Sequence, residues 1–447
     1  MKIMFISLGC DKNLVDSEMM LGILSEKGHT FTDDELQAEV IVVNTCCFIG
    51  DAKEESINTL IEMGALKESG NLKLLIAAGC LAQRYHEEIK TEIPEVDVIV
   101  GTMAIDRIAE AVEQFEKELR EDFVADINAP VVCGKKRVVT TGGHFAYLKI
   151  AEGCEKHCTY CIIPKVRGNY RSVPMEVLLR EAQSLVEQGV KELILVAQET
   201  TLYGKDLYGE KSLPKLLKEL AKIQGLYWIR ILYCYPEEIT EELIETIRTE
   251  DKVCNYLDIP IQHASDSVLR RMGRRTNQAQ LREKISMLRK AIPDICLRTT
   301  LITGFPGETQ EDHEQLMMFV DEMEFDRLGV FTYSPEEDTP AAEFADQIDE
   351  ELKSDRQAEI MELQQEIAFD KAADMAGREV LVMIEGKVSD ENAYVGRTYK
   401  DAPNVDGLVF VNTDLELMTG DFVPVKITGS YEYDLIGEIA DENEFTE

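Results

Sequence analysis

Three cysteines stand close together in the sequence "GCEKHCTYC", at Cys154, Cys158 and Cys161. On a helix this spacing would place all three thiols on one apolar stripe. Gly153 directly before the group and Pro164 shortly after it favour a loop instead, as do the polar residues between the cysteines. The spacing therefore predicts a loop that presents three thiols together.

A loop with three thiolates can hold three irons of a four-iron cluster and leave the fourth iron without a protein ligand. Zinc is the alternative, because Cys₃His is a known structural ligand set and His157 and His144 are near in sequence. The paired short spacings usual for zinc sites are absent from this loop. The residues alone leave both metals open.

Three further cysteines, Cys10, Cys46 and Cys80, each end an apolar run: "KIMFISL", "VIVVNT" and "LLIAAG". With "VDVIVG", these runs alternate with helix-like stretches up to about residue 101, which predicts an open parallel α/β sheet. Ligands of such sheets bind outside the carboxyl ends of the strands, so we expect the three thiols to converge there. A single cysteine is more often a small buried hydrophobe, and we assign that role to Cys47.

The cysteine loop follows the first of six strand-like runs that alternate with helical patterns. The runs are "FAYLKIAEG", "ELILVAQ", "YWIRILY", "YLDIPIQ", "CLRTTLITG" and "RLGVFTY". Six β/α repeats predict a barrel, or a partial (β/α)6 barrel, whose chemistry lies at the carboxyl ends of the strands. The loop stands in that position.

A charged segment over residues 346–376 predicts a helix that ends near Gly377. Beyond it, "EVLVMIEG", "GLVFVNT", "DFVPVKITGSY" and "LIGEIA" predict a small antiparallel barrel of the oligonucleotide-binding kind. Residues 378–447 nevertheless carry 16 acidic and 5 basic side chains, a net charge of −11. Phosphate binding needs basic residues, so an RNA partner is disfavoured for this barrel.

Composition limits the function further. The 447 residues include 11 cysteines and carry a net charge of −38. The sequence shows no secretory signal and no apolar run of the ~20 residues that a membrane span requires, so we expect a cytoplasmic protein with no membrane partner. Thiols stay reduced there, which favours metal binding or catalysis over disulfides. The charge disfavours direct nucleic-acid binding and favours a basic protein as partner.

"CEKHCTYC" resembles the C-x₃-C-x₂-C signature of the radical S-adenosylmethionine enzymes. "SLGCDKNLVDSE", "VVNTCCFI" and "AAGCLAQRY" resemble the amino-terminal domain of one family within them, the methylthiotransferases, and the last segment resembles their TRAM barrel. The resemblance implies S-adenosylmethionine and two [4Fe-4S] clusters, the second one held by the cysteines of the amino-terminal domain. It thereby extends over the whole chain and implies an α/β multidomain protein.

Within this family, "CDKNLVDSE", "YCYPEEIT", "DIPIQHASDSVLRRMGR" and "TTLITGFPGET" are most similar to the branch that methylthiolates an aspartate of small-subunit ribosomal protein twelve. The tRNA-adenosine branch more often has Gln-Met-Asn where this chain has Asp11, Lys12 and Asn13. One S-adenosylmethionine would methylate a sulfur on the second cluster. Another would give the radical that removes hydrogen from the aspartate β-carbon, with an external electron donor and sulfur source.

The resemblance also implies contacts to S-adenosylmethionine. These would come from the signature aromatic residue, the end of the second barrel strand and the "TTLITGFPGE" strand: Tyr160, Gln198, Glu199, Ile302, Gly304 and Glu308. For the last two groups, a solvated strand end and an ordinary βα turn are the alternatives. We assign His263 to packing or hydrogen bonding, and the remaining cysteines, Cys133, Cys234, Cys254 and Cys296, to packing.

These expectations divide the chain into a methylthiotransferase amino-terminal domain at 1–140, a radical S-adenosylmethionine core with helical linker at 141–376 and a TRAM barrel at 377–447. Two other functions are open. A tRNA adenosine methylthiotransferase would need a basic groove on the terminal barrel, and a non-catalytic metal-binding, ribosome-associated protein would not cleave S-adenosylmethionine. The substrate of the favoured function is ribosomal protein twelve, free or in the subunit.

Overall fold

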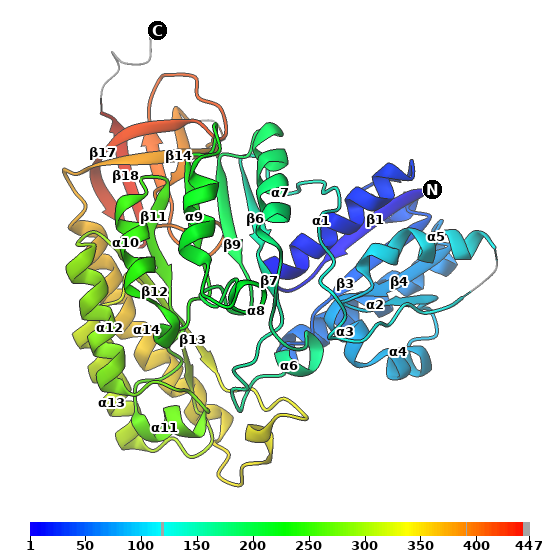
Figure 1. Ribbon diagram of the computed structural model, residues 1–447, viewed down its shortest axis with the longest axis horizontal. Helices are drawn as coiled ribbons and strands as arrows, with labels where there is room; N and C mark the ends of the chain where they lie inside the picture. The colour runs from blue at the N-terminus through cyan, green and yellow to red at the C-terminus, as the bar shows by residue number, and fades with distance from the viewer. Residues whose placement is uncertain (118–119, 390, 441–447) are drawn as a thin grey trace.

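The amino-terminal part of the molecule is a parallel sheet covered by helices on both faces (Figure 1). The computed structural model describes residues 1–117, 120–389 and 391–440. The strand order is β2-β1-β3-β4-β5, with bounds β1 Lys2–Ser7, β2 Thr30–Phe31, β3 Val40–Thr45, β4 Leu74–Ala78 and β5 Val98–Val100. The helices are α1 Asp11–Glu26, α2 Gly50–Ser69, α3 Gly79–Arg84, α4 His86–Glu92 and α5 Ile108–Glu116, with 3₁₀ turns η1 Glu35–Gln37 and η2 Ile105–Arg107.

The predicted open sheet is confirmed, and its physical basis is the continuous apolar character of the central strands. Every residue of β3, β4 and β5 is buried. Two separate apolar clusters pack on the two faces of the sheet, one beneath α2 and α3 and the other beneath α1 and α5. A strand buried on both faces reads as an unbroken apolar run, which made these strands visible in the sequence. The two-residue β2 has no such run and was not predicted.

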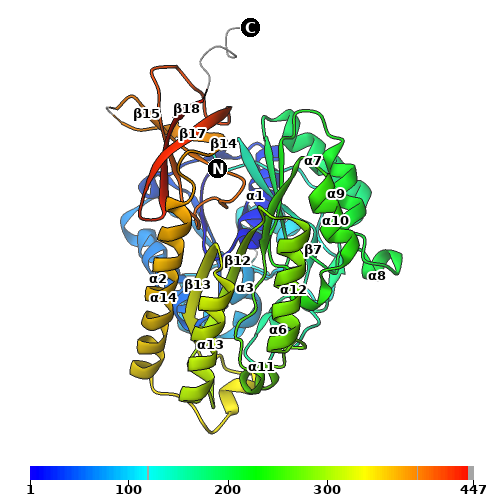
Figure 2. The ribbon, with the colours of Figure 1, turned by 90° about the vertical axis from the view of Figure 1, so that its left-hand side faces the viewer.

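The second part contains the six predicted strands in one open parallel sheet, ordered β13-β12-β11-β10-β9-β6. Figure 2 shows two of them, β12 and β13, side by side. Their bounds are β6 Phe145–Lys149, β9 Glu192–Val196, β10 Trp228–Ile231, β11 Val253–Asp258, β12 Cys296–Thr303 and β13 Arg327–Thr332. The intervening long helices are α7 Met175–Glu187, α9 Leu213–Ala221, α10 Glu241–Thr249, α12 Gln278–Ala291 and α13 Gln310–Met323. The partial barrel is thus confirmed, with β6 and β13 as its edges.

Short elements border the ends of these strands. They are β7 Ala151–Glu152, α6 Ile163–Val166, β8 Arg171–Ser172, α8 Lys205–Tyr208, η3 Pro236–Glu238, α11 Asp266–Arg271 and η4 Pro340–Glu343. The β7 and β8 strands pair antiparallel and flank the cysteine loop. The loop is therefore held at both ends.

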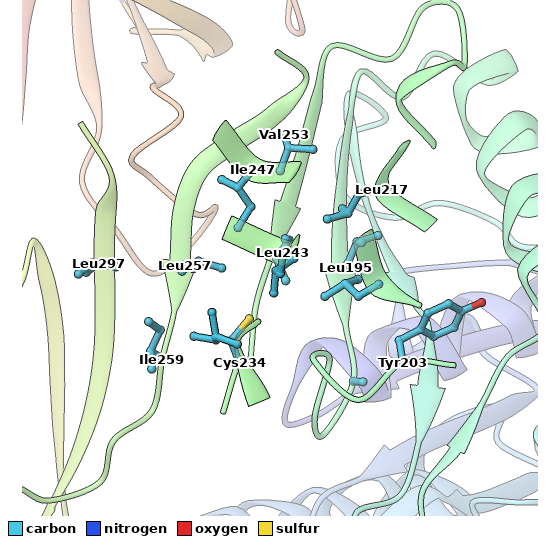
Figure 3. Packing of buried hydrophobic residues seen from close by; sticks show 14 of the residues in the cluster. Leu195, Tyr203, Leu217, Cys234, Leu243, Ile247, Val253, Leu257, Ile259 and Leu297 are labelled. Atoms are coloured by element: carbon cyan, nitrogen blue, oxygen red, sulfur yellow. The ribbon is translucent and has the colours of Figure 1, made fainter. Parts of the chain in front are cut away.

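Two faces of the six-stranded sheet bury different side chains. On the outer face, Leu195 and Leu257 of the strands pack with Leu217 of α9 and Leu243 of α10 (Figure 3). On the inner face, Ile194 and its neighbours pack in a separate cluster that also takes residues from α1 and from the carboxyl-terminal part. Side chains thus fill the barrel at the level of the strands, and the space for chemistry lies at their carboxyl ends.

Helix α14, Glu350–Ala373, leads to a closed five-stranded barrel in the order β14-β15-β16-β18-β17. The bounds are β14 Glu379–Lys387, β15 Ala393–Arg397, β16 Val409–Asn412, β17 Phe422–Tyr431 and β18 Asp434–Ile439. The predicted barrel is confirmed, although β16 and β18 pair in parallel and β15 was not predicted. The sequence "AYVGR" of β15 is too short to stand out. None of the helices in the described ranges is both long and apolar enough to cross a membrane.

A buried ion triad docks this barrel on the six-stranded sheet. Glu192, the first residue of β9, accepts from Arg230 Nε at 2.7 Å and from Arg397 Nη2 at 2.7 Å. All three side chains are at most 1% exposed. The triad lies at the amino ends of the strands, so the terminal barrel covers the end of the sheet opposite the cysteine loop.

The amino-terminal part contacts both edges of the open sheet. At the β6 edge, Arg137, which pairs with Glu18 of α1 at 2.5 Å, donates to the Tyr147 carbonyl of β6 at 2.8 Å. Beyond β13, Lys53 of α2 pairs with Glu336 at 2.8 Å, and Arg84 Nη2 donates to the Glu337 carbonyl at 2.7 Å. The amino-terminal part therefore bridges the opening between the two edge strands.

Candidate active site

The structure brings Cys10, Cys46 and Cys80 together at the carboxyl ends of three adjacent strands. Cys10 follows β1 and caps α1, Cys46 directly follows β3, and Cys80 is the second residue of α3, after β4. Burial is the main reason that the pKa of Cys46 is raised, and the nearby Cys10 thiol adds to it; both thiols also act on Cys80. The three thiols therefore share one electrostatic environment. The neighbouring Cys47 packs in the apolar cluster beneath α2, and its thiol also acts on Cys80.

Glycine precedes two of these cysteines for steric reasons. Gly9 and Gly79 have φ of +84° and +88°, a region that disfavours side chains. A Cβ on Gly9 would lie 2.8 Å from Cys46 Sγ, and one on Gly79 would lie 2.7 Å from the Thr45 carbonyl oxygen. The tight approach of strand ends that gathers the thiols thus leaves no room for a side chain.

Arg167, from the second part of the chain, sets the charge beside these thiols. Its Nε donates to Cys80 Sγ at 3.3 Å and its Nη2 to Asn13 Oδ1 at 2.5 Å. Its Nη1 pairs with Asp16 at 2.8 Å and with Glu152 at 3.1 Å, and the side chain is 1% exposed. Burial raises the pKa of Cys80, whereas Arg167 opposes that rise. A fixed cation favours the thiolate that iron requires.

Cys154, Cys158 and Cys161 lie on a loop, as predicted from the flanking residues. Cys154 N donates to the Gly168 carbonyl at 3.1 Å. Thr159 N donates to the Met272 carbonyl at 2.9 Å, and the Thr159 carbonyl accepts from Ala341 N at 2.9 Å. These bonds tie the loop to segments from both sides of the barrel. Burial raises the pKa of Cys154 to about 11, which a bound cationic metal would offset.

The geometry does not provide a zinc site from the histidines considered. His144 lies at the opposite end of the sheet, where its Nε2 is 3.1 Å from Glu385 of the terminal barrel, and His157 is exposed. Within the described ranges, no three His, Cys, Asp or Glu side chains are close enough together to coordinate a single metal ion. A four-iron cube separates its thiolates more widely than a single ion does, so both thiol groups fit such clusters in donor type and burial.

A three-residue segment after β10 connects the two thiol groups. The Tyr235 hydroxyl lies 3.7 Å from Cys158 Sγ. Two residues earlier, the ring of Tyr233 lies 3.5 Å from the Nζ of Lys12, which is two residues from Cys10. Only one residue separates Tyr233 from Tyr235, so this short segment at the carboxyl end of β10 lies between the cysteine loop and the turn that carries Cys10.

The residues predicted after β9 contact the cysteine loop rather than solvent. Gln198 Oε1 accepts from Gly153 N at 2.9 Å, and Gln198 Nε2 donates to Glu152 at 3.0 Å. Glu199 is fully buried; its Oε1 accepts from Thr201 N at 2.9 Å, and its Oε2 has no hydrogen-bond partner. Burial raises the pKa of Glu199 to about 7. An unpartnered buried carboxylate oxygen of this kind can accept from the ammonium group of a ligand.

The predicted site residues at the end of β12 and just beyond it lie in two different environments. Gly304 has φ of +68°, and its Cβ would lie 2.9 Å from Lys353 Cβ of α14. Glu308 accepts from Arg356 Nη1 of α14 at 3.0 Å, and burial raises its pKa to about 7. Both residues therefore hold α14 against the sheet.

Ile302 and Tyr160 instead pack on the apolar cluster around Phe305. The ring of Tyr160 stands edge-on to that of Phe305, with 6.4 Å between centroids. This cluster borders the cysteine loop, which leaves these two residues close to the thiols. His263 is buried and its Nδ1 accepts from Ser265 N at 2.9 Å, in line with the expected hydrogen-bonding role.

Several residues of this region were not predicted as site residues from the sequence. Arg167, Glu152 and Tyr233 carry no local signal, because an isolated arginine, glutamate or tyrosine has no diagnostic neighbours. Lys12 and Asn13 lie within three positions of Cys10, and that proximity was an available signal. Cys234, Cys254 and Cys296 are buried in apolar clusters, as predicted.

Three family models match this chain. Uncharacterized protein family UPF0004 matches residues 2–101, the Radical SAM superfamily matches residues 148–320, and the TRAM domain matches residues 376–440. Each match covers one of the three parts of the fold. Together they span most of the chain.

Solved structures share the fold at low sequence identity. The methyltransferase TsrM from Kitasatospora setae, titled a radical S-adenosylmethionine enzyme with cobalamin and [4Fe-4S] cluster bound, matches with a TM-score of 0.56 at 12% identity, over 84% of this chain and 78% of that one. OxsB, titled a cobalamin-dependent S-adenosylmethionine radical enzyme, matches with a TM-score of 0.54 at 14% identity, over 81% of this chain and 56% of that one. These likenesses bear on the fold alone.

Curated relatives are much more similar over nearly the whole chain. Proteins named ribosomal protein uS12 methylthiotransferase RimO are 62% identical in Lachnoclostridium phytofermentans, over 98% of this chain and 99% of the relative, and 51% identical in Thermoanaerobacter sp., over 97% and 98%. The one from Clostridioides difficile is 50% identical over 98% of this chain and 99% of its own. The chain therefore belongs to the RimO family of radical S-adenosylmethionine methylthiotransferases.

Proposed function

We propose that this protein transfers a methylthio group to the β-carbon of an aspartate in small-subunit ribosomal protein uS12, either free or in the subunit. The observation that carries the proposal is the short Tyr233–Tyr235 segment, which touches Cys158 at one end and Lys12, beside Cys10, at the other. One site thus has a thiol group on each side. The names of the relatives support the choice of uS12 as substrate.

The radical SAM domain accounts for an iron–sulfur cluster and S-adenosylmethionine. We extend this to two [4Fe-4S] clusters, one held by Cys154, Cys158 and Cys161 and the other by the cysteines at the strand ends, Cys10, Cys46 and Cys80. When bound, these groups supply a 5′-deoxyadenosyl radical and a methylated sulfur. Such chemistry suits an unactivated carbon–hydrogen bond, which acid and base catalysis cannot break.

The side chains around this site hold and orient its parts. Glu199 offers a buried carboxylate oxygen to the ammonium of S-adenosylmethionine, and Gln198 fixes the start of the cysteine loop. Tyr160 and Ile302 border the same region, whereas Gly304 and Glu308 support it through α14. Arg167 places a positive charge beside Cys80, which favours its thiolate form.

The proposed division of labour follows the three parts of the chain. Residues 1–140 would carry the second cluster, residues 141–376 the radical core and its helical linker, and residues 377–447 the TRAM barrel. The net charge of −11 on the last part favours docking of a basic ribosomal protein over nucleic acid. An electron donor and a sulfur source from outside the chain complete a reaction that we place in the cytoplasm.

The test is anaerobic reconstitution followed by incubation with S-adenosylmethionine, a reductant and uS12 or the small subunit. We expect a methylthio mass increment on one aspartate of uS12 and none on tRNA incubated in parallel, both measured by mass spectrometry. An increment on tRNA alone would assign the protein to the other substrate class. Metal binding without formation of 5′-deoxyadenosine would exclude an enzyme altogether.

Iron content tests the cluster assignment independently of turnover. The reconstituted protein should bind about eight irons, and Cys10→Ala or Cys154→Ala should each lose about four and the methylthio product. Cys133→Ala removes a half-buried thiol outside both groups and should bind as much iron as the unchanged protein. Retention of about eight irons in Cys10→Ala would contradict the second cluster.

A further inference from the structure

Lys12 is a buried cation at the proposed site that lacks a carboxylate partner. It is 6% exposed, and no carboxylate of the described residues lies within 4.0 Å of its Nζ. Its close contact is the ring of Tyr233, 3.5 Å from Nζ to the ring centroid. A buried charge is costly unless an opposite charge accompanies it. Tyr233, the Cys10 thiol and Asp11 act on the charge of Lys12, but none of the described carboxylates pairs with its Nζ directly.

Most other buried cations of this interface are already neutralised. Lys149 pairs with Glu152 at 2.9 Å, Lys156 pairs with Glu237 at 3.0 Å, and Arg167 pairs with Asp16 at 2.8 Å. Arg274, the comparable exception, lies over the ring of Tyr235 on the side of Cys158. Lys12 thus stands out on the side of Cys10.

The backbone around Tyr233 fixes the position of the cation. Tyr233 has φ of +60°, a conformation that is strained for a tyrosine. Its N donates to Asp258 at 3.0 Å, and its carbonyl accepts from Thr200 N at 3.1 Å. The ring is therefore held under Lys12 by hydrogen bonds from two other strand ends, which restrains where the ammonium can lie.

We propose that Lys12 binds the side-chain carboxylate of the substrate aspartate and so positions its β-carbon for methylthiolation. This rests on the proposed function, in which that carbon must approach a sulfur held by the Cys10 group. The carboxylate is one bond from the reacting carbon, and Lys12 is two residues from Cys10. A cation beside the Cys10 group would therefore meet the carboxylate that is bonded to the reacting carbon. Lys12 acts as a positioning residue that also selects an acidic substrate residue.

The test is a double-mutant cycle across enzyme and substrate. The unchanged enzyme should lose on the order of 10- to 100-fold in kcat when the target aspartate of uS12 is changed to asparagine, the range expected for a charged hydrogen bond. Lys12→Met should lose a similar factor in kcat on uS12 with its aspartate. Its kcat should then be about the same for the aspartate and the asparagine forms of uS12. Because uS12 docks through a wider surface, the loss should fall on kcat rather than KM.

Two further variants control the cycle. Lys12→Arg keeps the charge and should retain a preference for aspartate. Lys27→Met removes the same charge at the other end of α1, where Lys27 is exposed and pairs with Glu113, and should match the unchanged enzyme. The ratio of 5′-deoxyadenosine to methylthio product should rise in Lys12→Met alone, because a misplaced carbon accepts the radical less often.

Two results would overturn the inference while leaving the proposed function intact. One is an unchanged enzyme that modifies uS12 but accepts asparagine equally well, a result that does not depend on how any variant folds. The other is a Lys12→Met enzyme that loses iron in proportion to activity, which would mean that the cation serves the cluster. Failure of the unchanged enzyme on uS12 would instead remove the proposed function, and this inference with it.

Discussion

Two buried glutamates near the cysteine loop have opposite pKa shifts. Burial alone would raise the pKa of Glu152, but Arg167 and Lys149 outweigh it and lower that pKa to about 2. Glu199 is equally buried and has only Lys156 at 4.0 Å, so burial dominates and its pKa rises to about 7. Glu152 is therefore a permanent anion of the interface, whereas Glu199 ionises near neutral pH and can respond to a ligand.

Glu199→Gln should stabilise the protein without ligand but weaken its binding of S-adenosylmethionine. The folded-state pKa of Glu199 is raised from 4.5 to about 7, so folding stability falls as pH rises through that window. The amide should recover up to about 3 kcal/mol of unfolding free energy above pH 7. In the unchanged protein, affinity for S-adenosylmethionine should increase as pH rises through about 7, because the carboxylate becomes charged.

Anaerobic urea unfolding and equilibrium binding across pH 5.5 to 8 measure both effects. Glu187→Gln, at an exposed helical glutamate, should change neither quantity. A pH-independent affinity in the unchanged protein would show that Glu199 does not meet the ammonium group.

At the scale of secondary-structure elements, each thiol group depends on turns that only glycine can make. Gly9, Gly79 and Gly153 each precede a cysteine and each have a positive φ, between +81° and +88°. A Cβ on Gly153 would lie 2.6 Å from the Gly168 carbonyl oxygen. The strand therefore ends sharply, and the next residue turns its thiol toward the shared site.

Gly79→Ala should destabilise the fold and disturb the second thiol group. Its φ of +88° costs about 1 kcal/mol for alanine, and the overlap with Asn44 and the Thr45 carbonyl adds about 1–3 kcal/mol. Gly28→Ala is the matched control, because Gly28 has φ of +82° and nothing within 4 Å of a Cβ. We expect a loss of about 1 kcal/mol and full iron content for Gly28→Ala. The midpoints of urea unfolding and the iron content of both variants measure these effects. Equal losses in the two variants would refute the steric argument.

In the molecule as a whole, the six-stranded sheet forms two interfaces of different chemistry, one with the amino-terminal part and one with the terminal barrel. The amino-terminal part bridges both sheet edges through ion pairs that include half-exposed side chains, such as that of Lys53. The terminal barrel lies at one end of the sheet (Figure 2). It docks there through the fully buried Arg230–Glu192–Arg397 triad. The interface with the amino-terminal part borders the proposed site. The interface with the terminal barrel holds that acidic domain at the far end of the sheet.

Glu192→Ala should loosen the terminal barrel. The substitution leaves Arg230 buried without its carboxylate and removes one of the two partners of Arg397, which typically costs about 3–5 kcal/mol. Hydrogen exchange should increase in β9, β14 and β15 before the rest of the molecule. Glu113→Ala breaks an exposed pair with Lys27 and should change the free energy of unfolding far less. Unchanged exchange at the interface with the terminal barrel would mean that apolar packing alone docks the barrel.

Net charge predicts the salt dependence of substrate capture. A chain with a net charge of −38 should attract a basic ribosomal protein over long range, so kcat/KM for free uS12 should fall roughly tenfold or more from low salt to ~0.5 M. Cleavage of S-adenosylmethionine without uS12 serves as the internal control and should vary much less. A kcat/KM that does not depend on salt would assign docking to apolar contacts.

The three-part architecture and the two groups of cysteines could be predicted from the sequence, because both leave local signals. Buried parallel strands are continuous apolar runs, β/α repeats alternate regularly, and the cysteines stand at run ends or in one short motif. The strands that the sequence did not reveal, β2, β8 and β15, are too short to form a recognisable apolar run.

The residues that complete the site could be identified from the folded structure but not from the sequence. Arg167 reaches Cys80 across 87 positions, and Tyr233 meets Lys12 across the interface between two parts of the chain. It also separated residues that the sequence had grouped, since Gly304 and Glu308 support α14 while Ile302 and Tyr160 border the thiols. The physical reason is that charge pairing and close packing depend on distances between segments far apart in the chain, and no local pattern encodes those distances.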